Sequence, residues 1–361
     1  MLPYMEADRR CLLDIEARIL DLERSISTLR TEQARVQERL NSYTYPILTL
    51  PNEITLEIFL RFLPIYPKSP PLIGLHSPTC LAQVCRQWKE LVLTTPELWR
   101  AIGLRGKIPY KQRREISAVW IARSGACPLS IDIELPPSYR SLPEMCIEAL
   151  AHQARWEHLK LNVPLSAFPV FNAPMPLLQS LDLDINSLDS SGGEIEFNGL
   201  SLLRRVVATG LAVSKVTLPW GQLTSLSLYA DARQCLSVLR QAPNLVHCHL
   251  DLWTSGIFDS DQVEQDIALP RLEVLVLDNA YGLSMLGVLN SLVIPALREL
   301  ELEEDSLGEN PISSLQSFIA KSGCRLERMD ITRVGGGKGD ANSYHLAFPS
   351  IPIFLDGVVV S

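Results

Sequence analysis

The chain has 361 residues, of which 47% are hydrophobic and 20% are charged, and its formal net charge is −8. This composition predicts roughly two or three domains with a sizeable core, and the acidic balance gives no nucleic-acid footprint over the whole chain. No stretch approaches the ~20 apolar residues of a membrane helix, and the opening residues, MLPYMEADRR, lack the pattern of a secretory signal. The eight cysteines are scattered without CxxC spacing, which predicts reduced thiols and a location in the cytoplasm, the nucleus or both.

Residues 8–42 carry a heptad repeat, with apolar side chains at alternating steps of three and four residues. This apolar seam consists of Leu12, Ile15, Ile19, Leu22, Ile26, Leu29, Val36 and Leu40, with Gln33 in the remaining place. So narrow a stripe predicts a coiled-coil helix and a possible homodimer, and Gln33 is expected to cost some stability and to fix the register. The alternative is a single amphipathic helix that folds back on the rest of the chain.

Residues 45–102 begin with the stretch LTLPNEITLEIFLRFLP (48–64), which predicts a short helix over 52–63 that ends before Pro64. Ile54 and Ile58 lie one turn apart on this helix. Ser77 before Pro78 predicts the start of a second helix over CLAQVCRQWKELVL, and Thr95 before Pro96 predicts a third. Three short helices cannot hide this much apolar surface, so one side is expected to bind another protein.

The order and spacing of LPNEITLEIF (50–59), LAQVCRQW (81–88) and TPELW (95–99) resemble an F-box, followed by a C-terminal leucine-rich-repeat-like domain as in F-box proteins abundant in fungi. The resemblance implies docking onto a Skp-type adaptor, which bridges to a cullin and so to a ubiquitin-conjugating enzyme. It also implies two sets of adaptor-binding residues. The expected interface consists of Leu50, Pro51, Ile54 and Ile58, while a second set either shares it or fills the motif's own core: Val84, Trp88, Leu98 and Trp99. The loop 64–77 is longer than in many F-boxes.

Residues 103–127 predict a linker helix whose basic run, Lys107, Lys111, Arg113 and Arg114, is interpreted as a solvated face and not as a nucleic-acid site. The stretch PLSIDIEL that follows alternates as a strand does, with Leu129, Ile131 and Ile133 on one side.

From Trp156 onward the pattern apolar-x-x-apolar-x-apolar recurs eight times, at intervals of 20 to 29 residues. It begins at Trp156, Leu178, Leu203, Leu223, Leu245, Leu272, Leu297 and Leu326. The spacing resembles that of leucine-rich repeats and predicts an α/β solenoid over 128–334, with a curved parallel sheet. The segments 232–243 and 311–323 are expected as helices on its convex side. Asn186 fits the asparagine of such repeats, but the other units mostly lack it. Residues 335–361 form either a C-terminal cap with an end strand or a tail without structure.

The variable positions of each repeat are expected on the open side of this sheet, where solenoids commonly bind partners. The candidate target-binding residues are His158, Lys160, Asp182, Arg205, His247, His249, Val274, Val276, Glu299 and Glu301. This surface is expected to be basic at its start, apolar around Val274 and acidic at Glu299. The alternative is a plain solvated face that binds nothing.

No sequence pattern in the chain predicts a metal site, a phosphate-binding loop or a catalytic site. His247 and His249 share one side of a strand with no evident third ligand, so a metal is not expected. The glycine-rich stretch VGGGKGD (334–340) lacks the spacing of a phosphate-binding loop, and no catalytic constellation is evident. The sequence therefore predicts a substrate-recognition subunit of a Skp-cullin-F-box ubiquitin ligase that is not an enzyme and needs no cofactor. The alternatives are a non-catalytic scaffold without ubiquitin transfer and, last, an enzyme.

Overall fold

The computed structural model describes residues 2–43, 45–105, 109–138, 146–168, 171, 173–185, 195–253, 266–278, 285–333 and 341–360. The chain forms two compact units, Met1–Ile58 and Phe59–Ser361, and the boundary falls within one helix. Lys107, Asn186 and the stretch 334–340, which carry predictions above, lie outside the described residues. Within the described part, no helix has the length and apolar content needed to cross a membrane.

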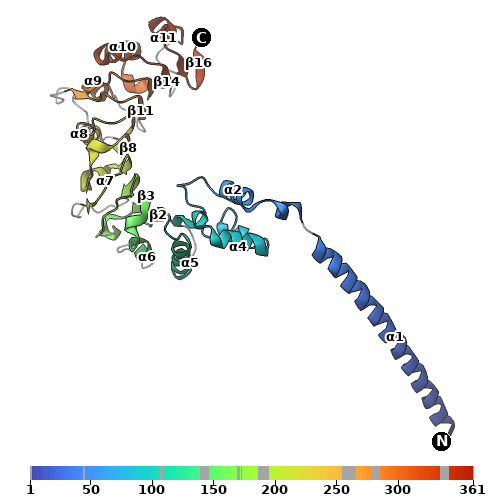
Figure 1. Ribbon diagram of the computed structural model, residues 1–361. Coiled ribbons are helices and arrows are strands. Elements are labelled where there is room, and N and C mark those ends of the chain that lie inside the picture. The colour runs from blue at the N-terminus through green and yellow to red at the C-terminus, as the bar shows by residue number, and fades with distance from the viewer. Residues whose placement is uncertain are drawn as a thin grey trace. The chain divides into compact units, whose positions relative to one another are not determined.

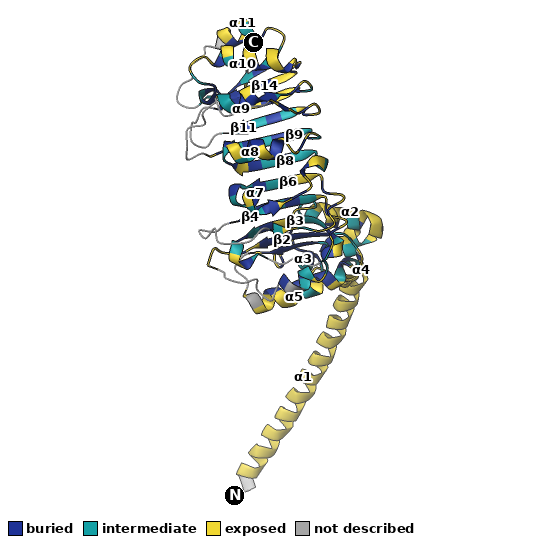
Figure 2. Ribbon diagram, turned by 90° about the vertical axis from the view of Figure 1, so that its left-hand side faces the viewer, coloured by how far each residue is buried: buried dark blue, intermediate teal, exposed yellow. Residues whose placement is uncertain are grey.

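The unit Met1–Ile58 consists mainly of helix α1 (Leu2–Ser42), which covers the whole predicted heptad region and starts six residues before it. Every described side chain of α1 is exposed (Figure 2). A short 3-10 helix (Pro46–Thr49) comes next, and then α2 (Asn52–Phe62) begins. A helix over 8–42 is thus confirmed, while its pairing with another helix stays a prediction.

The unit Phe59–Ser361 opens with short helices that the sequence places correctly, apart from one break. Helix α3 (Pro78–Leu81) starts where the side chain of Ser77 accepts a hydrogen bond from the Thr79 amide. Helix α4 (Arg86–Thr94) is separate from α3, because Cys85 adopts an extended conformation and its sulfur caps the new helix. A 3-10 turn (Pro96–Trp99) comes after α4. The single helix predicted over CLAQVCRQWKELVL is therefore wrong.

Helix α5 (Tyr110–Arg123) occupies the predicted linker, but one residue of the basic run, Arg113, is buried. Arg113 and Trp120 are buried, 4% and 1% exposed, whereas Val119 is exposed. The basic run is therefore not wholly a solvated face. Arg113 and Trp120 are seven residues apart, which places both on one side of a helix.

A sheet of twelve strands, in the order β1-β2-β3-β4-β6-β8-β9-β11-β13-β14-β15-β16, forms the body of this unit (Figure 1). All eight strands predicted from the repeat are present and parallel: β3 (Trp156–Val163), β4 (Ser180–Ile185), β6 (Arg205–Thr209), β8 (Ser225–Ala230), β9 (His247–Leu252), β11 (Val274–Asp278), β13 (Glu299–Glu303) and β14 (Arg328–Thr332). β1 (Ala101–Leu104) and β2 (Leu129–Glu134) precede them. Two small sheets pair β10 (Ile267–Ala268) with β12 (Leu292–Val293) and β5 (Ile195–Glu196) with β7 (Val216–Thr217).

From β4 to β14, alternate residues of each strand are buried on the side of the sheet that the helices cover, while the other side is open (Figures 1 and 2). In β1 and β2 both sides are buried, except at Glu134. The helices of the covered side include α7 (Gly210–Lys215), α8 (Ala232–Leu239), α9 (Leu286–Ser291) and α10 (Pro311–Ser322). The two segments predicted as convex-side helices, 232–243 and 311–323, correspond to α8 and α10. A short helix, α6 (Ile147–Leu150), lies between β2 and β3 in the chain. This parallel α/β body fits the repeat interpretation, whereas membership of the leucine-rich-repeat family and the curvature of the sheet stay predictions.

The described part of the C-terminal segment adds an end to the sheet. After α11 (Ala341–Ala347), β15 (Ile353–Leu355) pairs with β14 in parallel and β16 (Val358–Val360) returns antiparallel to β15. Asp356 and Gly357 have φ values of 50° and 78°, as a two-residue hairpin turn requires. Asp356 also accepts hydrogen bonds from the backbone N–H and the Nε of Arg333, at 2.8 and 2.9 Å. Of the two alternatives for this segment, the end strand holds for these residues.

Candidate protein-interaction surfaces

The first candidate adaptor-binding residues lie at the start of α2. Ile54 and Ile58 are 52% and 42% exposed although both are large and β-branched. Leu50 is half-buried and Pro51 is exposed. The backbone carbonyl of Pro51 accepts a hydrogen bond from the Thr55 amide at 3.1 Å, which closes the first turn and sets both isoleucines on one face. A pair of exposed apolar side chains on one turn is typical of a surface that binds another protein.

The second candidate set, in the unit Phe59–Ser361, divides into surface and core. Val84 is 59% exposed, and Trp88 is half-buried with its ring 4.8 Å from that of Phe59. Leu98 and Trp99 are 2% and 0% exposed. Of the two roles that the sequence left open, Leu98 and Trp99 take the core role.

The burial of Trp99 depends on groups that lie on both sides of it in the sequence. Its indole N–H donates to the carbonyl of Val92 at 2.8 Å, and its ring meets that of Trp120 edge to face at 5.3 Å. The guanidinium of Arg123 lies over the Trp99 ring at 4.5 Å. A fully hydrogen-bonded indole in an aromatic cluster is part of the fold's interior and is not free to reach an adaptor.

Residues 64–77, here called the proline loop, join α2 to α3 and contact the open side of β2 and β3. The hydroxyl of Tyr66 donates to the Glu157 carboxylate at 2.8 Å, and the carbonyl of Pro67 accepts from the Ser130 hydroxyl at 2.6 Å. Ser69 donates to Asp132 at 3.3 Å. The loop therefore lies over β2 and β3 rather than in solvent.

Electrostatics and close packing support this contact. Burial against Glu157 raises the pKa of Tyr66, and desolvation raises the pKa of Asp132 although Arg105 lies 3.2 Å away. A side chain at Gly103 would meet the Ser69 hydroxyl oxygen at 2.7 Å, so any larger residue there would require the Ser69 side chain to shift. Sequence reasoning missed this contact; its only signals were the length of the loop and its four prolines.

The candidate target-binding residues form two rows across the open face. In each row the members are direct partners on neighbouring strands. The first row runs His158, Ser180, Arg205, Ser225, His247, Val274, Glu299 and Arg328; the second runs Lys160, Asp182, Val207, Ser227, His249, Val276, Glu301 and Asp330. All ten predicted residues thus lie in these two rows.

Part of the charge on this face is paired within the chain. Lys160 contacts the Asp182 carboxylate at 2.6 Å, so the expected basic start is partly neutralised. Arg328 contacts Asp330 at 2.6 Å and lies over the ring of Phe354 at 4.5 Å.

His158 is less accessible than the sequence predicted. Its ring meets that of Tyr66 in the proline loop at 5.2 Å, and burial lowers its pKa. The proline loop therefore covers His158 at the side of the open face next to β2, while Lys160 on β3 is exposed, and the accessible part extends from Lys160 to β14.

The histidines of β9 point to the open face while Cys248 between them is buried. His249 hydrogen-bonds to Asp278 on β11 at 2.8 Å. In the part of the chain that the structure describes, no three or more metal-ligating side chains cluster.

The six-residue repeat pattern missed a third row, one step further along the strands. It includes Tyr229 and Asp251, and beyond it Trp253 is 47% exposed and donates its indole N–H to the Tyr229 carbonyl at 3.1 Å. These aromatic side chains add apolar area to a face that already carries Val207, Val274 and Val276. Extending the alternation by two residues would have revealed Tyr229 and Asp251, and extending it by four would have revealed Trp253.

Comparison with known protein families identifies one segment of the chain. Residues 47–105 match the family model of F-box-like domains, and no curated protein matches the chain. The match covers both candidate sets of adaptor-binding residues and ends just after β1. F-box domains bind Skp-type adaptors and are typically non-catalytic, so the chain carries a protein-binding module joined to a large parallel sheet.

Proposed function

We propose that this chain is the substrate-recognition subunit of a Skp-cullin-F-box ubiquitin ligase and does no bond chemistry itself. The F-box-like match at residues 47–105 carries the proposal, and the exposure of Ile54, Ile58 and Val84 supports it. The adaptor binds this segment and links it to a cullin. A target held by the same chain then reaches a high local concentration near the conjugating enzyme. The chain accelerates ubiquitin transfer only by this proximity, and the conjugating enzyme performs the reaction.

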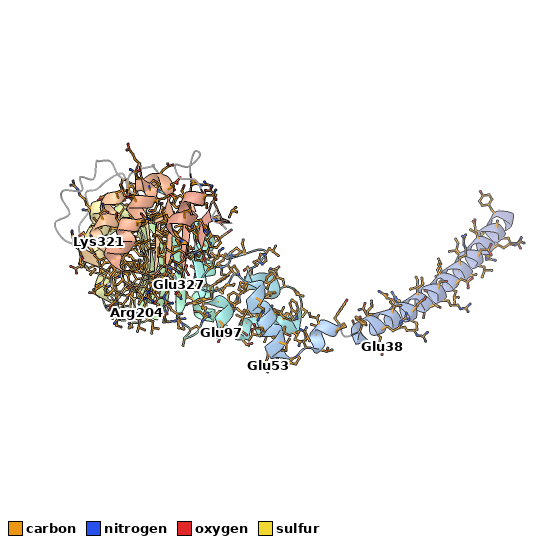
Figure 3. All side chains as sticks on the ribbon, turned by 90° about the horizontal axis from the view of Figure 1, so that it is seen from above. Glu38, Glu53, Glu97, Arg204, Lys321 and Glu327 are labelled. Carbon is orange, nitrogen blue, oxygen red and sulfur yellow. The ribbon has the colours of Figure 1, made fainter. Side chains whose placement is uncertain are left out.

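Capture of a purified Skp-type adaptor by the full chain tests the proposal. Ile54→Ala with Ile58→Ala should weaken capture by about 10- to 100-fold, because buried apolar anchors dominate protein interfaces. Leu50→Ala with Pro51→Ala should weaken it as well. Glu53→Gln, which changes an exposed residue of the same helix, is the matched control and should leave capture intact (Figure 3). No capture by the unaltered chain would refute the proposal.

We propose that the target binds the open face from Lys160 on β3 to β14. Two rows of accessible side chains in register support this, as does the acidic end at Glu299 and Glu301, which suits a target segment of positive charge. Proximity labelling in cells should lose specific neighbours when both residues are changed to Lys. Glu309→Lys, an exposed change outside the strands, should retain them. Identical neighbours in all three cases would refute this placement.

The second candidate function is a scaffold that binds partners without ubiquitin transfer. Reconstitution with adaptor, cullin and conjugating enzyme separates the two. Ubiquitin transfer to the chain or its captured neighbours supports the ligase, while capture without transfer supports the scaffold.

We further propose that the chain works in the cytoplasm, the nucleus or both. We also propose that it divides into five parts: the coiled-coil helix 8–42, the F-box 45–102, the linker helix 103–127, the repeat solenoid 128–334 and the C-terminal segment 335–361. Eight free cysteines support a reducing compartment. We also propose that α1 pairs two copies of the chain, because its apolar seam is exposed.

A further inference from the structure

Helix α1 presents a continuous apolar seam, and every described side chain of this helix is exposed. The helix has 41 residues and therefore extends about 60 Å at 1.5 Å per residue. The seam residues are between 39% exposed, at Val36, and 65% exposed, at Leu29. Helices in water draw most of their stability from packing such a face, so this seam needs an occupant along its length.

The seam residues divide into the two inward positions of a heptad. The first position holds Leu12, Ile19, Ile26, Gln33 and Leu40, and the second holds Ile15, Leu22, Leu29 and Val36. The two central heptads therefore place isoleucine at the first position and leucine at the second. That combination favours two parallel strands over three or four.

We infer that α1 pairs with α1 of a second copy of this chain as a parallel, two-stranded coiled coil with no offset between the helices. In this arrangement Gln33 meets Gln33 of the second copy, and each amide can donate to and accept from the other. An antiparallel pair that overlaps residues 12–40 sets Gln33 opposite Ile15 or Leu22 instead. The buried amide would then lack a polar partner, which is costly.

The charges beside the seam agree with the parallel arrangement. Residues five apart face each other across such a pair, which brings Arg18 to Glu23 of the second copy on both sides. The remaining facing pairs are Cys11 with Glu16, Ser25 with Arg30, and Glu32 with Gln37. No two charges of like sign face each other, so charge does not oppose this register.

Parallel pairing places the two F-box-like segments of the dimer at the same end of the coiled coil. Both helices end at Ser42 on the same side of the pair, so both F-box-like segments continue from that side. The next consequence rests on the proposed function. A parallel dimer would carry two adaptor sites and two target faces, and it would bind a target with two binding segments with higher avidity. The pairing itself does not depend on ubiquitin transfer.

Disulfide cross-linking of the full chain in a Cys11→Ser background tests the orientation. Ile15→Cys and Val36→Cys should each link to themselves under mild oxidation, because like residues of the seam face each other only in the parallel register. Glu38→Cys is the matched control, since Glu38 is exposed and lies two residues from Val36, outside the two seam positions of the heptad. Linking should exceed the control by at least about 10-fold, since a disulfide needs Cα atoms within ~7 Å.

Light scattering of the full chain completes the test. The unaltered chain should have the mass of a dimer, and Ile19→Asp with Ile26→Asp should have that of a monomer while retaining adaptor capture. A monomeric unaltered chain would overturn the pairing, and self-linking at neither seam position would overturn the parallel register. If no variant captures the adaptor but the dimer forms, the proposed function fails and the pairing stands.

Discussion

Truncating one buried side chain in the centre of the sheet tests the in-and-out alternation on which the open face depends. Leu250 on β9 is fully buried between Leu228 and Leu277, its partners on the neighbouring strands. Leu250→Ala removes its contacts with both partners and leaves a cavity, which costs about 3 kcal/mol within the usual range for such changes. With an m-value of about 3 kcal/mol/M for a unit of this size, the urea midpoint should fall by about 1 M.

Val276→Ala is the matched control, because Val276 lies on β11 one residue before Leu277 and faces the open side. It is only half-buried, so its truncation should cost under about 1 kcal/mol and shift the midpoint by under about 0.3 M. Urea unfolding followed by circular dichroism measures both variants. Equal shifts, or a larger shift for Val276→Ala, would refute the alternation, because a slip of one residue exchanges the two faces.

Three further predictions concern single groups. Tyr66→Phe removes the hydrogen bond to Glu157 and should lower the free energy of unfolding by about 1 kcal/mol, measured by urea unfolding; no loss would show that the contact does not hold the proline loop. Because burial lowers the pKa of His158 below its ordinary 6.5, the unfolded chain binds more protons there, so stability should fall as the pH drops below 6.5. Urea midpoints of His158→Gln should show a weaker pH dependence over that range, and an unchanged one would count against it. Burial raises the pKa of Cys248 to about 12, so a thiol reagent should label exposed Cys11 in the native chain and Cys248 only after unfolding; prompt labelling of Cys248 would contradict its placement.

The strands of the repeat could be predicted because their signal is local. A buried strand of a one-sided sheet alternates with a period of two, and this period alone assigned Lys160 and Asp330 to the open side. Because both residues occupy the same position of the recurring six-residue pattern, they were also placed in one row, although they are 170 residues apart in the sequence. Strand β1 (Ala101–Leu104) was not predicted, because a run of four apolar residues that includes a glycine is compatible with a strand, a helix or a loop.

The roles within the F-box-like segment could be predicted only in part. Ile54 and Ile58 follow from helical spacing, whereas the burial of Trp99 depends on Trp120, which lies in another helix. The proline loop depends on contacts with residues such as Glu157, 91 positions away from Tyr66. Propensity carries no information about such pairings, so the sequence could not place the loop on the sheet.

The passage from the last F-box-like turn to the sheet contains one residue. The 3-10 turn ends at Trp99, β1 begins at Ala101, and the proline loop adds a second attachment through Ser69. Within the unit Phe59–Ser361, the F-box-like helices from α3 onward therefore continue into the sheet without an intervening linker. Under the function proposed above, a target held on the sheet would present its lysines from a body fused directly to these helices, so this short connection would help to select which lysines are modified.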